Sequence, residues 1–71
     1  MNTTYRVSFV ACTTEATARE AVEGINGGDA FEIRTADVGG TVTAWFTVET
    51  GREKWVDAEL VADARVDRYS W

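Results

Sequence analysis

Apolar and polar residues alternate without a break from Thr41 to Glu49, and this is the most regular pattern in the chain. Alternation at period two with many β-branched residues predicts a half-buried β-strand. The set that would face the core is Val42, Ala44, Phe46 and Val48. The opposite set is Thr41, Thr43, Trp45, Thr47 and Glu49, in which Trp45 is the one large aromatic. An outward aromatic makes this side of the predicted sheet the first candidate for a function.

Two glycines, Gly39 and Gly40, precede this strand and predict a two-residue hairpin loop, because glycine readily adopts the positive φ angles of primed turns. The preceding strand would then span residues 30 to 38. Counting outward from the loop predicts three pairs on the core face: Phe31 with Val48, Ile33 with Phe46 and Thr35 with Ala44. It predicts two pairs on the outward face: Arg34 with Trp45 and Glu32 with Thr47. The apolar residues of both strands agree on this register, and a slip of one residue would reverse every face.

The segment before the hairpin predicts a strand followed by a helix. The inward positions of the strand are Tyr5, Val7, Phe9 and Ala11. Thr13 or Thr14 can cap the helix, with Glu15 in the first turn, where its negative charge suits the helix dipole. The apolar stripe of the helix, at i, i+3, i+4 and i+7 spacing, is Ala18, Ala21, Val22 and Ile25. Asn26-Gly27-Gly28 predicts its end.

The segment after the hairpin predicts a second helix and a last strand. Thr50 and Glu53 match a capping box, so a helix should start there and run to about residue 61. It would bury Val56 and Leu60 at i, i+4 spacing. The period is ambiguous because alternate residues from 56 to 66 are also apolar, but the alanine, glutamate, lysine and leucine content favours the helix. Residues 64 to 71 then form the last strand.

This order of elements, β-α-β-β-α-β, predicts an α+β fold of the ferredoxin-like type, a four-stranded antiparallel sheet with two helices on one face. The first and third strands would be central, and the other face would stay open. The first three strands would give this face Arg6, Ser8, Glu32, Arg34, Thr43, Trp45 and Thr47. The last strand would add one of two sets, Arg65, Asp67, Tyr69 and Trp71 or Val66, Arg68 and Ser70.

Length and composition are those of one small globular domain, residues 1–71, with 45% hydrophobic residues. Cys12 is the one cysteine, so no intramolecular disulfide can form and a cytoplasmic location is expected. The sequence shows no signal-peptide pattern and no apolar segment long enough to span a bilayer, so no membrane association is expected. The net charge of −5 disfavours binding to a phosphate backbone and favours a basic partner.

The open face combines Trp45 with Arg34 and Arg6, a composition that is enriched at protein interfaces. Two interpretations fit it. In the first, the face binds a protein through Trp45, Arg34, Arg6, Thr43, Thr47 and Glu32. In the second, Arg34 only shields Trp45 in a cation–π pair worth about 0.5–1 kcal/mol.

The open face also resembles in outline the sheet of RNA-recognition domains, which stacks bases on aromatics of its central strands. The first strand, however, offers Arg6, Ser8 and Val10 where that family has an aromatic, and the chain is acidic. Nucleic acid is therefore not an expected partner.

Cys12 closes the first strand just before a helix. Heavy-metal-associated domains with the same order of elements place a Cys-x-x-Cys pair there, and Cys12-Thr-Thr-Glu15 resembles a degraded form of it. The resemblance implies a soft-metal site, for which one thiolate and one carboxylate are a poor donor set. The competing interpretation is a small buried residue at a strand end. We expect no metal and no cofactor.

Catalysis is not expected, because the chain has no histidine and no serine or threonine in a nucleophile elbow. The leading hypothesis is a small non-enzymatic protein-binding module whose partner is a basic protein or a second copy of the chain. One context for such a module is a phage or mobile-element protein that binds and modulates a host protein. The alternative is a small ligand- or metal-binding regulatory domain of the degenerate heavy-metal-associated type.

Overall fold

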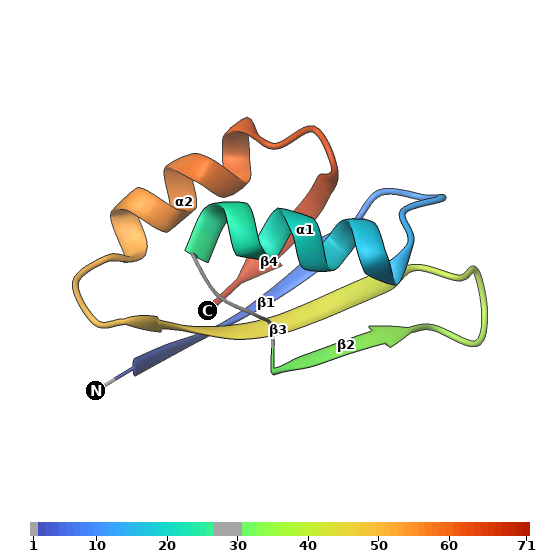
Figure 1. The fold of residues 1–71 in the computed structure, drawn as a ribbon, viewed down its shortest axis with the longest axis horizontal. Helices are drawn as coiled ribbons and strands as arrows, with labels where there is room; N and C mark the ends of the chain where they lie inside the picture. The colour runs from blue at the N-terminus through green and yellow to red at the C-terminus, as the bar shows by residue number, and fades with distance from the viewer. Residues whose placement is uncertain (1, 27–30) are drawn as a thin grey trace.

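The computed structural model describes residues 2–26 and 31–71. Its elements are β1 (Asn2–Phe9), α1 (Glu15–Asn26), β2 (Glu32–Thr35), β3 (Val42–Glu49), α2 (Glu53–Ala62) and β4 (Val66–Ser70). The strands form one sheet in the order β2-β3-β1-β4, with antiparallel neighbours throughout, and both helices lie on the same side of it (Figure 1). The ferredoxin-like prediction, with the first and third strands central, is confirmed.

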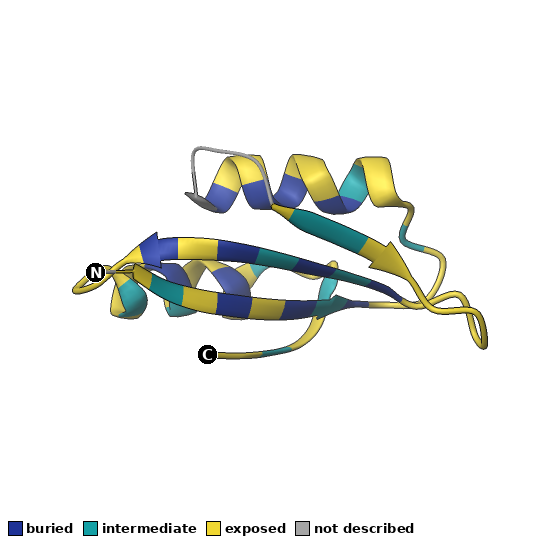
Figure 2. Ribbon diagram, turned by 90° about the horizontal axis from the view of Figure 1, so that it is seen from below, coloured by how far each residue is buried: buried dark blue, intermediate teal, exposed yellow. Residues whose placement is uncertain are grey.

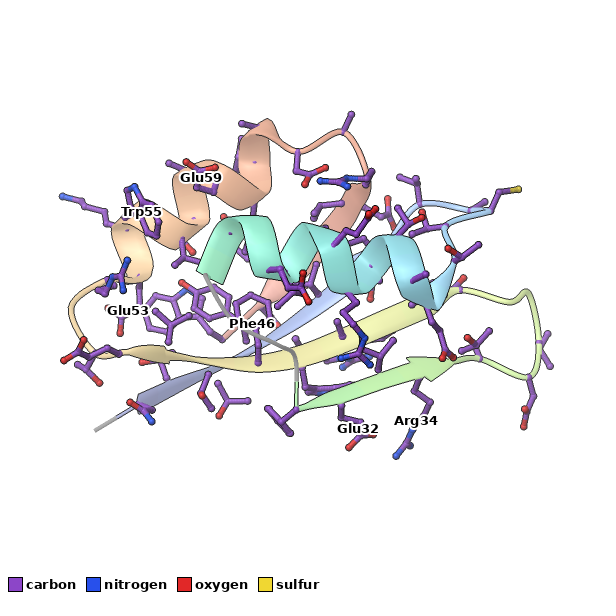
Figure 3. The ribbon with its side chains drawn as sticks, in the orientation of Figure 1. Glu32, Arg34, Phe46, Glu53, Trp55 and Glu59 are labelled. Atoms are coloured by element: carbon purple, nitrogen blue, oxygen red, sulfur yellow. The ribbon has the colours of Figure 1, made fainter. Side chains whose placement is uncertain are left out.

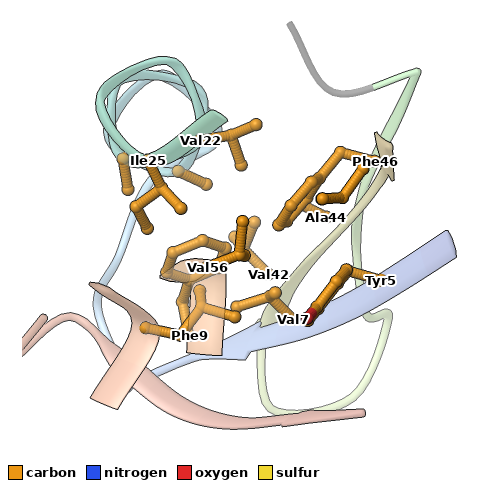
Figure 4. Close-up of a cluster of buried hydrophobic side chains, with 13 residues drawn as sticks. Tyr5, Val7, Phe9, Val22, Ile25, Val42, Ala44, Phe46 and Val56 are labelled. Carbon is orange, nitrogen blue, oxygen red and sulfur yellow. The ribbon is translucent and has the colours of Figure 1, made fainter. Parts of the chain in front are cut away.

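The core lies between the helices and one face of the sheet (Figure 4). Buried and outward-facing residues alternate along the two central strands, as the period-two pattern requires (Figure 2). The ring of Tyr5 stacks on that of Phe46, with centroids 5.4 Å apart. The buried residues are Tyr5, Val7, Phe9, Ala18, Ala21, Val22, Ile25, Val42, Ala44, Phe46, Val48, Val56 and Leu60. In the described part of the chain, neither helix is long and apolar enough to cross a membrane.

Strand β1 ends two residues earlier than predicted. The chain turns after Phe9, where the Thr13 amide donates to the Val10 carbonyl and Cys12 takes a left-handed φ of 71°. Ala11 is therefore exposed instead of buried. The helix that follows begins as predicted, because the Thr14 hydroxyl accepts a hydrogen bond from the Thr17 amide at 3.1 Å. The predicted Gly27-Gly28 stop lies outside the described residues.

The β2–β3 hairpin corrects the predicted register by two residues. The Ala36 amide donates to the Thr41 carbonyl, so residues 37 to 40 form a four-residue loop instead of Gly39 and Gly40 alone. Both glycines do have positive φ, 84° and 65°. The observed pairs are Glu32 with Trp45, Ile33 with Ala44, Arg34 with Thr43 and Thr35 with Val42. Because the shift is even, each residue keeps its predicted side of the sheet.

Shortening β2 to four residues changes the environment of Phe31. Phe31 was expected in the core, but it precedes the strand and its side chain is 62% exposed. Its amide still donates to the Trp45 carbonyl at 3.0 Å. The backbone of Phe31 therefore extends the pairing while its ring does not join the core.

Helix α2 is present where predicted but starts without the predicted capping box. It begins at Glu53, and the residue before it, Arg52, makes no side-chain cap. The Glu53 carboxylate instead reaches back to the Gly51 amide, with Oε1 accepting at 2.7 Å. Gly51 has a φ of 106°, which only glycine adopts at low cost, and the chain turns there before the helix begins, so the cap position falls on Arg52 instead of Thr50.

A bulge in β4 resolves the open question of its register. Tyr69 pairs with Val7 and Arg68 with Ser8, but Phe9 pairs with Val66, which leaves Asp67 as an extra residue. The bulge lets both Val66 and Tyr69 pack against the core while Arg68 projects from the other face. Neither predicted set is therefore correct as a whole.

Candidate functional site

The sheet face opposite the helices, here called the open face, is built from two rows of side chains that each cross all four strands. The tryptophan rung consists of Glu32, Trp45, Arg6 and Ser70, and the arginine rung consists of Arg34, Thr43, Ser8 and Arg68. None of these eight side chains is buried. Cross-strand neighbours in such rows lie close enough to act together on a bound molecule.

Trp45 occupies a central position in this lattice, between Glu32 on β2 and Arg6 on β1. Its ring is half-buried, so it is less exposed than expected, because neighbours on both sides and a guanidinium above cover part of it. The guanidinium carbon of Arg34 lies 5.7 Å from the ring centre. This contact is diagonal, since Arg34 pairs directly with Thr43. The predicted direct pair was wrong, but the cation–π contact is present.

Among the described residues, the charges of the open face are closely paired on β2 and loosely paired or unpaired on β1 and β4. On β2, Arg34 Nη2 lies 2.5 Å from Glu32 Oε2, and both residues project away from the helices (Figure 3). On β1, Arg6 makes no ion pair with any residue that the structure describes, and its partner across β4 is Ser70. Arg68 has only a long contact, 3.6 Å, to Asp67. The net positive charge of this face therefore lies over β1 and β4.

A hollow of about 570 Å³ lies on the same side of the open face. Its lining includes two guanidinium-bearing residues, Arg6 and Arg68, and the serines and threonines Ser8, Thr41, Thr43 and Ser70. It opens to solvent and offers many hydrogen-bond donors and one carboxylate, that of Asp67.

The structure brings together most, but not all, of the predicted site residues. Five of the six lie in the two rungs, whereas Thr47 pairs with Thr4 one row further along and is exposed. Arg68 and Ser70 belong to the site through the β4 bulge. Sequence reasoning had placed them there only as one of two alternatives, because a bulge leaves no clear mark on the alternation pattern.

A second tryptophan–arginine pair lies on the helical layer and was not predicted. The Arg52 guanidinium carbon is 4.8 Å from the ring centre of Trp55, which is 50% exposed and projects from α2 (Figure 3). The sequence signal that could have indicated this contact is the three-residue spacing of Arg52 and Trp55 at the start of a helix. This pair lies among carboxylates, since α2 carries Glu53, Asp57 and Glu59 against one lysine. The Arg52–Trp55 pair therefore provides a matched control for the Arg34–Trp45 pair of the open face.

A polar cluster joins β1 to α2 on the core side. The Tyr5 hydroxyl donates to Asp57 Oδ1 at 2.8 Å and the Thr3 hydroxyl donates to Glu53 Oε2 at 2.7 Å. Burial, and then the hydrogen bond to Asp57, raise the pKa of Tyr5 far above its ordinary value. The hydrogen bond from Thr3 is the main cause that lowers the pKa of Glu53. These groups satisfy one another, so the cluster acts as a tie between the two elements.

Cys12 is exposed in the β1–α1 turn, which corrects the expectation of a buried residue at a strand end. Because β1 ends at Phe9, Cys12 falls beyond the core. Glu15, the other residue of the degraded metal motif, accepts a hydrogen bond from the Thr35 hydroxyl at 2.6 Å. Among the residues described, no three histidine, cysteine, aspartate or glutamate side chains are grouped as metal ligands.

Comparison with known proteins assigns no family to this chain. No family model matches it, and no significant match to a curated protein or a solved structure was found. The ferredoxin-like topology therefore rests on the strand order and the registers alone.

Proposed function

We propose that this protein is a small, non-enzymatic protein-binding module and that its contact surface is the open face. The observation that carries the proposal is the position of Trp45 at the centre of the open four-stranded face, with the Arg34 guanidinium against its ring and Arg6 paired opposite it on β1. Tryptophan and arginine are the residues most enriched at binding hot spots, and a β-sheet holds them rigidly before a partner arrives.

A purely structural role for Trp45 is the competing explanation, because the Arg34 contact by itself stabilises the fold by about 0.5–1 kcal/mol. It accounts for one neighbour of the ring only. Arg6 pairs with Trp45 across β1 and β3 and makes no ion pair with a described residue, so no structural role of this kind explains it. An anchor with a polar rim is the usual arrangement of a protein interface.

The test compares two tryptophan variants. Tagged wild-type protein, Trp45→Thr and Trp55→Ala are used to capture proteins from a lysate of the native host, and the retained proteins are identified by mass spectrometry. Each substitution removes an indole that has an arginine beside it, and each introduces a residue suited to its own element. Truncating a hot spot costs 2 kcal/mol or more, so we expect Trp45→Thr to weaken binding by roughly 30-fold.

The proposal holds if one protein is retained by the wild type and by Trp55→Ala but lost with Trp45→Thr. Sedimentation of the three purified proteins covers the case in which the partner is a second copy, since Trp45→Thr should then abolish a dimer. If the retained protein depends on Trp55 and not on Trp45, the contact surface is α2 and the proposal is wrong. Circular dichroism confirms that each variant is folded.

A further inference from the structure

The net charge of the chain is distributed unevenly between its two layers. Helix α1 carries three glutamates and one arginine, and α2 carries two glutamates, one aspartate and one lysine. The two rungs of the open face instead carry three arginines, Arg6, Arg34 and Arg68, and one glutamate, Glu32. The overall charge of −5, from which a basic partner was expected, therefore does not describe the surface proposed to bind.

Two arginines of the open face, Arg6 and Arg68, have no carboxylate of the described residues within hydrogen-bond distance, and they are neighbours. Arg6 pairs with Ser70 and Ser8 pairs with Arg68, so Arg6 and Arg68 are diagonal neighbours across the β1–β4 ladder. Arg6 has no ion pair within the described residues, and the 3.6 Å contact between Arg68 and Asp67 is longer than a hydrogen bond. Two guanidinium groups on adjacent strands, both able to donate to a shared anion, flank the hollow.

The surroundings of this pair favour a carboxylate over a polyanion. The hydroxyls of Ser8, Thr43 and Ser70 add neutral donors beside the two guanidiniums. A carboxylate gains these hydrogen bonds. Every residue of a phosphate chain is charged, so a molecule with a charge of −5 would repel such a chain more strongly than a peptide segment in which charged and neutral residues alternate. The face also lacks the second aromatic that base stacking on a sheet requires, since the central positions of β1 are Arg6 and Ser8.

We propose that the hollow between Arg6 and Arg68 binds an aspartate or glutamate side chain from an acidic segment of the partner protein, next to the apolar contact at Trp45. This inference rests on the proposed function and assigns the chemistry of the partner. Arg6 connects the two parts of the site, because it pairs with Trp45 on one side and borders the hollow on the other.

The test uses defined probes and isotope-labelled protein. A blocked peptide of alternating glutamate and serine is titrated while amide and arginine side-chain NMR signals are followed, beside the matched lysine–serine peptide, inorganic phosphate and a short single-stranded oligothymidine. The protein variants are Arg6→Gln, Arg68→Gln and both together. Arg52→Gln is the control, because it makes the same charge change on the helical layer.

We expect the glutamate peptide to cause saturable shifts at Arg6, Ser8, Thr43 and Arg68. Losing a charged hydrogen-bond partner should weaken its binding about tenfold for each single substitution and remove saturation in the double variant. Arg52→Gln should bind as the wild type does, and added salt should weaken binding.

Several results would overturn the inference. Shifts that are absent, that are equal for the lysine peptide, or that fall equally with Arg52→Gln would show that no carboxylate site exists. Stronger binding of phosphate or oligothymidine would assign the site to phosphate groups instead. A captured partner that depends on Trp45 but is indifferent to Arg6→Gln and Arg68→Gln would leave the proposed function standing and refute the acidic segment alone.

Discussion

Tyr5 shows how one side chain can serve both the core and the polar tie to α2. Its ring is fully buried against Phe46, yet its hydroxyl donates to Asp57 at 2.8 Å and lies 3.2 Å from the Glu53 carbonyl. A buried hydroxyl without a partner would be costly, so these acceptors are what permits a tyrosine here. Replacement by phenylalanine keeps the ring and removes only the hydroxyl with its hydrogen bonds to Asp57 and the Glu53 carbonyl.

We expect Tyr5→Phe to lower the free energy of unfolding by about 1–2 kcal/mol at neutral pH. The pH dependence should differ as well. Because folding raises the pKa of Tyr5, the stabilisation is complete below about pH 10 and is lost as the pH rises above it, where the unfolded chain ionises first. Urea unfolding at neutral and alkaline pH should therefore show that the free energy of unfolding falls more between the two pH values for the wild type than for Tyr5→Phe.

Tyr69→Phe is the control for this prediction, because the Tyr69 ring packs near Tyr5 but its hydroxyl makes no hydrogen bond within the described residues. It should retain the wild-type stability at neutral pH to within about 0.5 kcal/mol. Equal losses in the two variants would show that the Tyr5 hydroxyl has no special role.

Among the elements, the first turn of α2 is stabilised in part by a residue of another element, Thr3 of β1. The Glu53 carboxylate is held by the Thr3 hydroxyl from β1 and by the Gly51 amide, both at 2.7 Å. Both bonds favour the ionised form and lower the pKa of Glu53. The stabilisation is therefore present above the ordinary value of 4.5 and is lost as the pH falls below it.

We expect Glu53→Gln to be less stable than the wild type at neutral pH and to lose less stability on acidification. Thermal unfolding followed between about pH 6 and pH 3 measures both effects. Glu59→Gln removes the same charge from the exposed side of the same helix and makes a matched comparison (Figure 3). If the acid-dependent loss is the same in Glu53→Gln as in the wild type, another carboxyl group is responsible for it.

The helices and strands also show where sequence reasoning succeeds and where it stops. The buried stripe of α1 followed from periodicity, and the position of α2 followed from its composition and the Thr50–Glu53 pattern, because these signals act within a short segment. The hairpin register was wrong by two residues because Gly39 and Gly40 fit a two-residue loop and a four-residue loop equally well. The contact from Thr3 to Glu53 joins residues 50 positions apart, so no local pattern could indicate it.

For the whole molecule, the order of elements was enough to predict the topology, because few folds satisfy short connections in a β-α-β-β-α-β chain. The candidate site was harder to predict. Trp45, Arg34 and Arg6 followed from alternation, which assigns residues to a face regardless of register. The position of Arg68 on the open face depends on the bulge at Asp67, which the alternation pattern does not reveal. The concentration of negative charge on the helical layer becomes visible only in the three-dimensional arrangement of the two layers.

A domain of 71 residues has one core, so a destabilising substitution at one point of the core should lower the stability of the whole domain. Leu60 is 1% exposed and anchors α2, whereas its neighbour Val61 is 75% exposed. Leu60→Ala should cost about 2–5 kcal/mol through lost burial and the cavity left behind. Domains of this size have a total stability of only about 4–10 kcal/mol. Val61→Ala, one position along the same helix, should change stability by no more than about 0.5 kcal/mol.

Urea unfolding of both variants, followed by helix signal and by tryptophan fluorescence, measures this difference. Each lost kcal/mol should lower the melting temperature by about 4–8 °C for a chain of this length, so Leu60→Ala should melt at least about 6 °C below Val61→Ala. The two probes should report the same midpoint, because α2 contributes Val56 and Leu60 to the core and cannot detach without exposing the only large apolar cluster in the described chain. Separate midpoints, with the helix signal lost first, would mean that the sheet with Trp45 persists without α2 and that the open face does not depend on the helical layer.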